Sequence, residues 1–104
     1  MNDYNADTKE RVDSKIQEKL HEPSMYKVLL HNDDYTTMEF VVDILVSVFN
    51  KSPENAVIIM LNVHRQGVGI CGVYTYDIAE TKVKIVKTMA GERDFPLKCT
   101  MEKD

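Results

Sequence analysis

Residues 32–40 of the chain read Asn-Asp-Asp-Tyr-Thr-Thr-Met-Glu-Phe, and this segment decides how the flanking chain folds. It lies between an apolar run, residues 25–30, and a helical pattern of apolar residues. Asn and Asp side chains hydrogen-bond to nearby backbone groups, which predicts a turn after the apolar run. Thr36 and Glu39 have the spacing of a capping box, so a helix is expected to begin within the next two residues. The segment is therefore predicted to be a loop between a strand and a helix.

This loop concentrates two carboxylates, an amide and a phenol at one place. Such a group of acceptors suits the recognition of a cationic ligand. A solvated turn between two regular elements explains the same residues, so both interpretations stay open at the level of the residues alone.

Length and charge restrict the class of protein. The 104 residues fit one small domain with an N-terminal extension, and the net charge of −4 argues against nucleic acid as the main partner. No apolar run approaches the ~20 residues of a membrane span and no signal peptide is recognised, so a cytoplasmic protein is expected. Cys71 and Cys99 lie in strand-like runs without C-x-x-C spacing. Reduced thiols are expected, with a pair between them as the alternative.

Hydrophobic periodicity divides the rest of the chain into six elements. The expected elements are a strand over residues 25–31, helices over 37–50 and 53–66, a strand over 68–74, a helix over 76–90 and a strand over 95–102. Ser52 and Thr75 are expected N-caps, and Gly67 and Gly91 are expected to end helices. The two glycines within the second strand indicate a bulge or a close backbone approach.

The order β-α-α-β-α-β predicts an α+β fold, a two-layer α/β sandwich. A three-stranded antiparallel sheet is expected to pack against three helices through one of its faces. Residues 1–24 are predicted to be a flexible N-terminal extension, because their few apolar residues do not offset the entropy of ordering them. Residues 25–104 are predicted to form the core domain.

The helix over residues 53–66 carries His64, for which a functional role and an ordinary core or surface position both stay open at the level of the residues alone. Met60, Val63 and His64 stand at i, i+3 and i+4 and therefore share a face. A hydrolase built on this histidine and the Asp33–Asp34 pair is disfavoured, because adjacent carboxylates in an extended chain point apart and no nucleophile motif accompanies them. A metal site is disfavoured by the lack of tight ligand spacing. We therefore expect a binding protein, not an enzyme, with no catalytic residue, metal or cofactor.

Several segments together resemble one family. They are Tyr26-Lys27-Val28, Asn32-Asp33-Asp34-Tyr35-Thr36, Met38-Glu39-Phe40-Val41, Met60-Leu61, Val63-His64, Gln66-Gly67, Cys71-Gly72-Val73, Ala79-Glu80-Thr81-Lys82-Val83, Pro96-Leu97, Cys99-Thr100 and Glu102. In one register over residues 24–104, the chain resembles the ClpS family, the adaptors of the ClpAP protease. One departure is Thr37, where the family usually has proline.

The resemblance implies a function and a set of sites. It implies that the chain binds proteins whose first residue is Leu, Phe, Tyr or Trp and delivers them to the ClpA unfoldase. The alternative is a general protein–protein interaction module without first-residue specificity. The resemblance implies that Asn32, Asp33, Asp34 and His64 bind the N-terminal amine of the ligand. It assigns the buried side chain of the ligand to Met38, Val41, Met60, Val63 and Leu97, with Met38 as gatekeeper, and contact with the N-terminal domain of ClpA to Glu80, Thr81 and Lys82.

Overall fold

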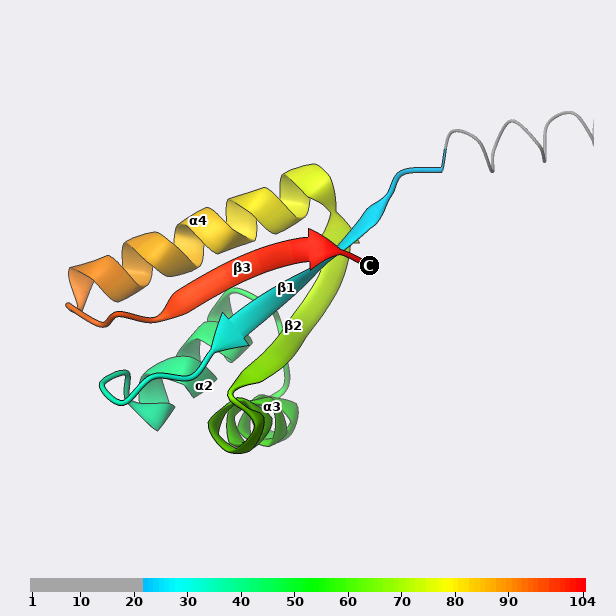
Figure 1. Cartoon of the computed structure of the whole chain (residues 1–104). Helices are drawn as coiled ribbons and strands as arrows, with labels where there is room; N and C mark the ends of the chain where they lie inside the picture. Colours follow the sequence, from blue (N-terminus) through cyan, green and yellow to red (C-terminus); the bar gives the residue numbers. More distant parts are fainter. Residues whose placement is uncertain (1–21) are drawn as a thin grey trace, which may run out of the picture.

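Six helices and strands make up residues 22–104, which are the residues that the computed structural model describes. They are β1 (Met25–His31), α2 (Met38–Ser47), α3 (Pro53–Gln66), β2 (Val68–Thr75), α4 (Tyr76–Glu92) and β3 (Lys98–Lys103). The sheet is antiparallel, with strand order β2-β1-β3 (Figure 1). The predicted fold class is thus confirmed. The predicted N-terminal extension, residues 1–24, lies outside the described residues except for its last three.

The core lies between the sheet and the helices. Val28 and Leu30 of β1 are fully buried, as the alternation of a half-buried strand requires. They belong to one hydrophobic cluster that all three helices enter, through Phe40, Val41, Ile44, Leu45, Ala56, Val63, Ala79, Val86 and Ala90. The other face of the sheet carries the alternate side chains of β1, Lys27, Leu29 and His31, which remain partly exposed.

The two glycines of β2 have the two effects that the sequence indicated. Val28 is opposite Gly72 and Leu29 is opposite Ile70, so Cys71 is an extra, bulged residue. At Gly69, an added Cβ would lie 2.6 Å from Cγ2 of Val63. The missing side chain therefore lets α3 pack closely on β2.

The ends of α3 follow the sequence prediction, and so does the start of α2 at Met38, whereas the capping residue and the last residue of α2 differ from it. Gly67 ends α3 in the left-handed region, with φ of 86°. The N-cap of α2 is Thr37, whose side chain accepts the N–H of Phe40 at 3.2 Å. The predicted capping box at Thr36 is wrong, because that hydroxyl is bound within the loop. The helix ends at Ser47, before the predicted residue 50, because the chain turns at Asn50 with φ of 56°.

The last two elements are each shifted from their predicted bounds. The prediction that Gly91 ends α4 is wrong: the helix continues to Glu92, and the chain reverses at Asp94 with φ of 57°. Thr75 is the N-cap residue of α4, but its side chain makes no capping hydrogen bond. Strand β3 begins at Lys98, later than predicted, because the segment before it packs inward, with the Phe95 ring 5.0 Å from that of Phe40.

Candidate functional site

A cavity of about 240 Å³ opens between the loop after β1, helix α2 and helix α3. Its polar lining consists of Asn32, Asp33, Asp34, Thr36 and His64, and its apolar lining of Met38, Val41, Met60 and Val63. The structure therefore brings together, around one cavity, all the residues predicted to bind the amine of a ligand. It also brings there four of the five residues predicted to surround the ligand's side chain. The cavity is smaller than the ~300–1,000 Å³ of pockets that take drug-sized ligands, which suits a single side chain.

Leu97 is the predicted pocket residue that does not line this cavity. It lies between α4 and β3 and is 7% exposed within the hydrophobic core. Val41 and Val63 are buried to a similar extent and line the cavity, so this burial does not decide the assignment of Leu97, which stays a prediction.

One backbone hydrogen bond joins the two sides of the cavity. The N–H of Asn32 donates to the carbonyl oxygen of Gly67 at 2.8 Å. Asn32 is the first residue of the loop, and Gly67 follows the last residue of α3. This bond holds the loop against the end of the helix that presents Met60, Val63 and His64. Sequence spacing indicates the shared face of the helix, but it does not reveal that this face meets the loop.

Asp33 organises the loop from within. Its Oδ1 accepts the backbone N–H groups of Tyr35 at 2.8 Å and Thr36 at 2.7 Å, and its Oδ2 accepts the Thr36 hydroxyl at 2.7 Å. Partial burial on its own would raise the pKa of Asp33, but the hydrogen bonds from Thr36 and Tyr35 outweigh it and lower the pKa below its ordinary value of 3.8. The carboxylate thus holds the loop in shape. The residue Thr36, which the sequence assigns to a helix cap, takes part in this turn, and the Asp-x-x-Thr spacing is the signal that indicates it.

The side chains of the two neighbours of Asp33 in the loop, and that of His64 on α3, are available to a ligand. Asn32, Asp34 and His64 are exposed and line the cavity. Within residues 22–104, none of these three side chains is engaged in a hydrogen bond or an ion pair. The rim therefore offers an amide oxygen, a carboxylate and an imidazole nitrogen as acceptors at one place.

The apolar lining changes from buried to exposed across the cavity. Val63 and Val41 are 3% and 7% exposed and belong to the core. Met60 is half-buried, and Met38, at the start of α2, is 47% exposed. Met38 is thus the flexible apolar side chain in contact with solvent, while the two valines form fixed walls.

The residues predicted to contact an unfoldase lie on α4 and do not line the cavity. Glu80 pairs with Lys84 at 3.5 Å and accepts the Tyr76 hydroxyl at 3.2 Å, while Thr81 is exposed. Lys82 differs from these, because its ammonium donates to the carbonyl oxygen of Val48 at 2.6 Å. Its charge is therefore partly engaged in holding the fold.

Three further properties concern the described part of the chain. No helix within residues 22–104 is long and apolar enough to cross a membrane. In the same range, no three side chains of His, Cys, Asp or Glu are grouped so as to hold a metal ion. Cys71 and Cys99 are free thiols, as expected.

The fold and the site define a small two-layer α+β domain with an apolar cavity rimmed by acidic and amide side chains. The chain matches, over residues 21–100, the model of the family described as ATP-dependent Clp protease adaptor protein ClpS. The chain therefore belongs to the ClpS family, whose members are adaptors of a protease, and the resemblance seen in the sequence is confirmed.

Relatives and a solved structure agree with this membership. The ATP-dependent Clp protease adapter protein ClpS of Desulforapulum autotrophicum is 62% identical over 96 residues, which are 92% of this chain and 92% of that protein. The one from Clostridium acetobutylicum is 60% identical over 87 residues, 84% of this chain and 86% of that protein. The structure of Agrobacterium tumefaciens ClpS2 bound to L-phenylalaninamide has a TM-score of 0.77 and 42% identity, covering 80% of this chain and 100% of that chain.

Proposed function

We propose that this chain binds the free N-termini of proteins that begin with Leu, Phe, Tyr or Trp and delivers those proteins to the ClpA unfoldase of the ClpAP protease. The observation that carries the proposal is the set of unengaged acceptors of Asn32, Asp34 and His64 at the rim of an apolar cavity. A first residue of this kind presents an ammonium and a large apolar side chain together, and the site offers a partner to each.

The amine is proposed to bind at the rim. An ammonium carries three hydrogen-bond donors, which can be matched by the Asn32 amide oxygen, the Asp34 carboxylate and a neutral His64 nitrogen. Asp33 contributes negative charge, while its own oxygens remain bound to Tyr35 and Thr36. Its contribution to binding is therefore to hold its two neighbours in place.

The side chain of the first residue is proposed to enter the cavity. Val41 and Val63 provide the buried walls, and Met38 and Met60 close around the ligand. Because Met38 lies at the start of α2 beside the loop, a side chain branched at Cβ would meet it close to the bound amine. This is the physical reason for treating Met38 as a gatekeeper against β-branched first residues.

The magnitudes are consistent with a useful affinity. Burying a Leu or Phe side chain contributes roughly 1.5–3 kcal/mol. Each hydrogen bond to the charged amine adds roughly 1.5–3 kcal/mol, before the cost of association is subtracted. Two or three such bonds with one buried side chain reach about the ~8 kcal/mol of a micromolar complex.

A relative supports the proposed ligand class. L-phenylalaninamide, the molecule bound to Agrobacterium tumefaciens ClpS2, combines a free α-amine with an aromatic side chain. A blocked carboxyl group resembles the first peptide bond of a longer chain. The same chemistry is what the rim and the cavity of this chain are suited to recognise.

Delivery requires a second surface, and we assign it to the outer side of α4. Thr81 is exposed there, next to Glu80, and the two residues are remote from the cavity lining. A substrate and the N-terminal domain of ClpA can therefore bind at the same time. Family membership supports a component of the Clp protease as this partner.

The test compares two peptides that differ only at the α-amine. A Leu-initiated peptide should bind with about micromolar affinity, and its N-acetylated form should bind at least ~100-fold more weakly, because the charge and two donors are lost. Equal affinities for the two forms would exclude capture of the amine. They would favour the alternative, a general interaction module that contacts side chains only.

Two variants assign the effect to the site. Asp34→Ala and His64→Ala should each reduce the affinity for the peptide with a free amine by about tenfold or more, since each removes one hydrogen bond to a charged group. Thr81→Ala, on α4, is the matched control and should bind the peptide normally while reducing capture by the N-terminal domain of ClpA. If Asp34→Ala and His64→Ala both bind the peptide normally, the assigned site is contradicted.

A further inference from the structure

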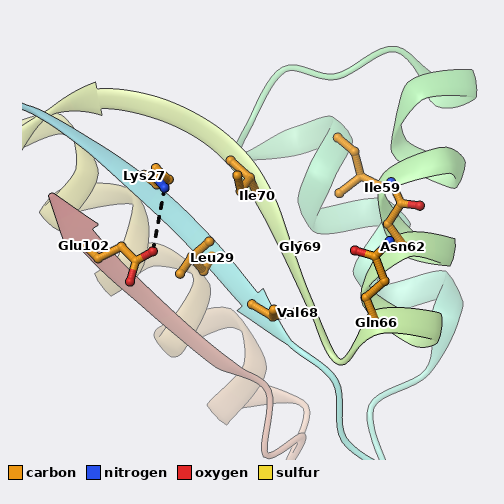
Figure 2. A pocket seen from close by; sticks show the side chains of 9 residues that line it. All are labelled: Lys27, Leu29, Ile59, Asn62, Gln66, Val68, Gly69, Ile70 and Glu102. Carbon is orange, nitrogen blue, oxygen red and sulfur yellow. Dashed lines mark ion pairs between the residues drawn. The ribbon is translucent and has the colours of Figure 1, made fainter. Parts of the chain in front are cut away.

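A second and larger depression, of about 450 Å³, lies on the open face of the sheet, where it meets α3. Leu29 of β1 and Val68 and Ile70 of β2 form its floor (Figure 2). Val68 and Ile70 are 37% and 50% exposed, which is unusual for apolar residues of a strand that packs on a core through its other face. We call this depression the sheet groove.

The bulge at Cys71 creates the apolar floor. Residues directly opposite each other in an antiparallel pair project to the same face, so Ile70 joins Leu29 and Val68 joins His31 on the open face. Without the extra residue, the alternation would turn the residues on one side of the bulge to the opposite face. The sheet groove therefore results from a specific feature of the backbone.

The wall of the sheet groove is formed by α3, with side chains that match a peptide backbone. Ile59, Asn62 and Gln66 follow one another along α3, across from the sheet (Figure 2). Asn62 and Gln66, four residues apart, each offer a donor and an acceptor, as a peptide group does. Within residues 22–104, neither amide is engaged in a side-chain hydrogen bond.

The charges around the sheet groove favour a neutral ligand segment. Its charged residues, Lys27 and Glu102, lie within 3.9 Å of each other at the end away from the loop. The outer strand beside the sheet groove, β2, carries no charged side chain and is an edge of the sheet, whereas β3, the other edge, carries Lys98, Glu102 and Lys103. An uncharged apolar floor of this kind favours contact with neutral apolar side chains.

The sheet groove adjoins the cavity of the candidate site. Gly67, which binds the N–H of Asn32, lies between Gln66 and Val68, and these two residues both line the sheet groove. On the other strand, His31 is paired with Val68, and the next residue, Asn32, lines the cavity. One hydrogen-bonded bridge therefore separates the rim that would hold an N-terminal amine from the near end of the sheet groove.

From this geometry we propose that the sheet groove binds the polypeptide that follows the captured first residue. This inference rests on the proposed function and extends it to a preference for the downstream sequence. An extended chain advances about 3.3 Å per residue, so the second residue crosses the Asn32–Gly67 bridge and the third to fifth lie over the floor. Alternate side chains face the floor, and neutral apolar residues at positions three and five are therefore preferred.

Three ligands test the proposal: leucine amide, and two amidated hexapeptides that begin with leucine and carry serine at positions two, four and six. One hexapeptide has valine at positions three and five, and the other has glycine there. The valine peptide should bind the wild-type chain about fivefold more tightly than the glycine peptide, because two apolar side chains become partly buried. Leucine amide reports on the cavity alone, since it does not reach the sheet groove.

Two variants of β2 provide the matched comparison. Ile70→Glu places a charge on the floor and should reduce the fivefold preference to less than twofold, with the affinity for leucine amide unchanged. Val73→Glu changes a residue that is 41% exposed in the same strand but does not line the sheet groove, so it should keep the preference. In NMR titrations, the backbone amides of Ile59, Asn62 and Gly69 should shift with the valine peptide and not with leucine amide.

The outcomes separate the two proposals. Binding of leucine amide with equal affinities for the two hexapeptides overturns the sheet groove and leaves the amine site standing. Failure of leucine amide and both hexapeptides to bind overturns the proposed function and the sheet groove with it. A concentration-dependent dimer in sedimentation equilibrium that Ile70→Glu abolishes assigns the sheet groove to a second copy of the chain and also overturns the inference.

Discussion

The backbone nitrogen of Asn32 and the carbonyl oxygen of Gly67 lie 2.8 Å apart, which joins the first residue of the loop after β1 to the residue that ends α3. Two parts of the chain that are more than thirty residues apart in sequence thus form one rim. The relative position of the loop acceptors and His64 depends on this bond. It also depends on Gly67 itself, whose φ of 86° is left-handed.

Gly67→Ala should therefore reduce both stability and binding. Nothing lies within 4 Å of a Cβ at this position, so the cost comes from the backbone conformation and not from a clash. We expect the free energy of unfolding to fall by about 1–2 kcal/mol, measured in urea. The affinity for a Leu-initiated peptide should fall as well, because the bridge to Asn32 shifts.

Gly91→Ala is the matched control for that substitution. Gly91 also has open space around an added Cβ, but it lies inside α4 and lacks the left-handed conformation. Here alanine should stabilise the chain by about 0.5–1 kcal/mol, since it favours the helix and restricts the unfolded state. If the two alanine variants have equal stabilities, the backbone of Gly67 is not the source of the effect.

Asp33→Ala tests the carboxylate that braces the loop. At pH 7 we expect a loss of about 1–2 kcal/mol in the free energy of unfolding, because the N–H groups of Tyr35 and Thr36 lose their acceptor. The hydrogen bonds lower the pKa of Asp33 in the folded chain, so its stabilisation is fully present above the ordinary value of 3.8. It is then lost as the pH falls below that value and through the lower folded pKa.

Denaturation curves at pH 7 and pH 3 measure this pH dependence. The difference between wild type and Asp33→Ala should be smaller at pH 3 than at pH 7. Asp34→Ala removes the neighbouring carboxylate, which braces no backbone group in residues 22–104, and should change the free energy of unfolding by less than ~0.5 kcal/mol at pH 7. A difference that grows toward acid pH would contradict the assigned role of Asp33.

The fold was predictable because its signals are local and repeated. The alternation around Val28 and Leu30 indicates a half-buried strand, and Ser52-Pro53 with Gly67 marks both ends of α3. The errors fall where local signals compete. Thr36 and Thr37 are both residues that cap helices well. Because the Thr36 hydroxyl donates to Asp33 within the loop, the Thr37 hydroxyl is the one that caps α2. Gly91 is tolerated inside α4, because the packing of the helix on the sheet outweighs its weak preference to stop.

The site was predictable only in part from physical signals. The shared face of Met60, Val63 and His64 follows from helical spacing, but the meeting of this face with the loop depends on a backbone bond that spacing does not encode. The family resemblance supplied that pairing. The role of Leu97 stays a prediction for a related reason, since an apolar residue before an edge strand fits a core position as well as a cavity wall. The sheet groove was not anticipated, because it requires the register shift at Cys71.

Met38→Ala should broaden the choice of first residue. Met38 lines the cavity and is 47% exposed, so truncation opens space near the bound amine without removing a core residue. Peptides that begin with Ile or Val should gain at least ~10-fold in affinity relative to Leu, which corresponds to about 1.4 kcal/mol. Fluorescence anisotropy with peptides that differ only at position one measures the ratio. An unchanged ratio would show that another residue excludes β-branched side chains.

Cys71 and Cys99 should be unreactive in the folded chain. Burial raises the pKa of each thiol to about 12, because desolvation disfavours the thiolate, so very little nucleophile is present at pH 8. A chromogenic disulfide reagent should label neither cysteine within minutes in buffer and both in guanidinium chloride. Ser47→Cys adds a thiol at an exposed position and should react at once. Rapid labelling of the native wild-type chain would contradict the burial of Cys71 and the partial burial of Cys99.

Lys82 allows its contribution to the fold to be tested separately from its contribution to the proposed interface on α4. Its ammonium donates to the Val48 carbonyl at 2.6 Å and lies 5.7 Å from the centroid of the Phe49 ring and 5.1 Å from that of Tyr74. Lys82→Met keeps most of the apolar stem but removes the charge at the C-terminal end of α2. We expect a loss of about 1–2 kcal/mol in the free energy of unfolding.

Lys84→Met is the control, because Lys84 is 73% exposed and pairs only with Glu80 in the described residues. Its loss should cost less than ~0.5 kcal/mol. Binding of the N-terminal domain of ClpA, measured where both variants are fully folded, then isolates the interface. If Lys82→Met is as stable as Lys84→Met and fails to bind that domain, Lys82 acts at the interface alone. If it is less stable and still binds, its contact with Val48 is its main function, and the interface on α4 is carried by Glu80 and Thr81.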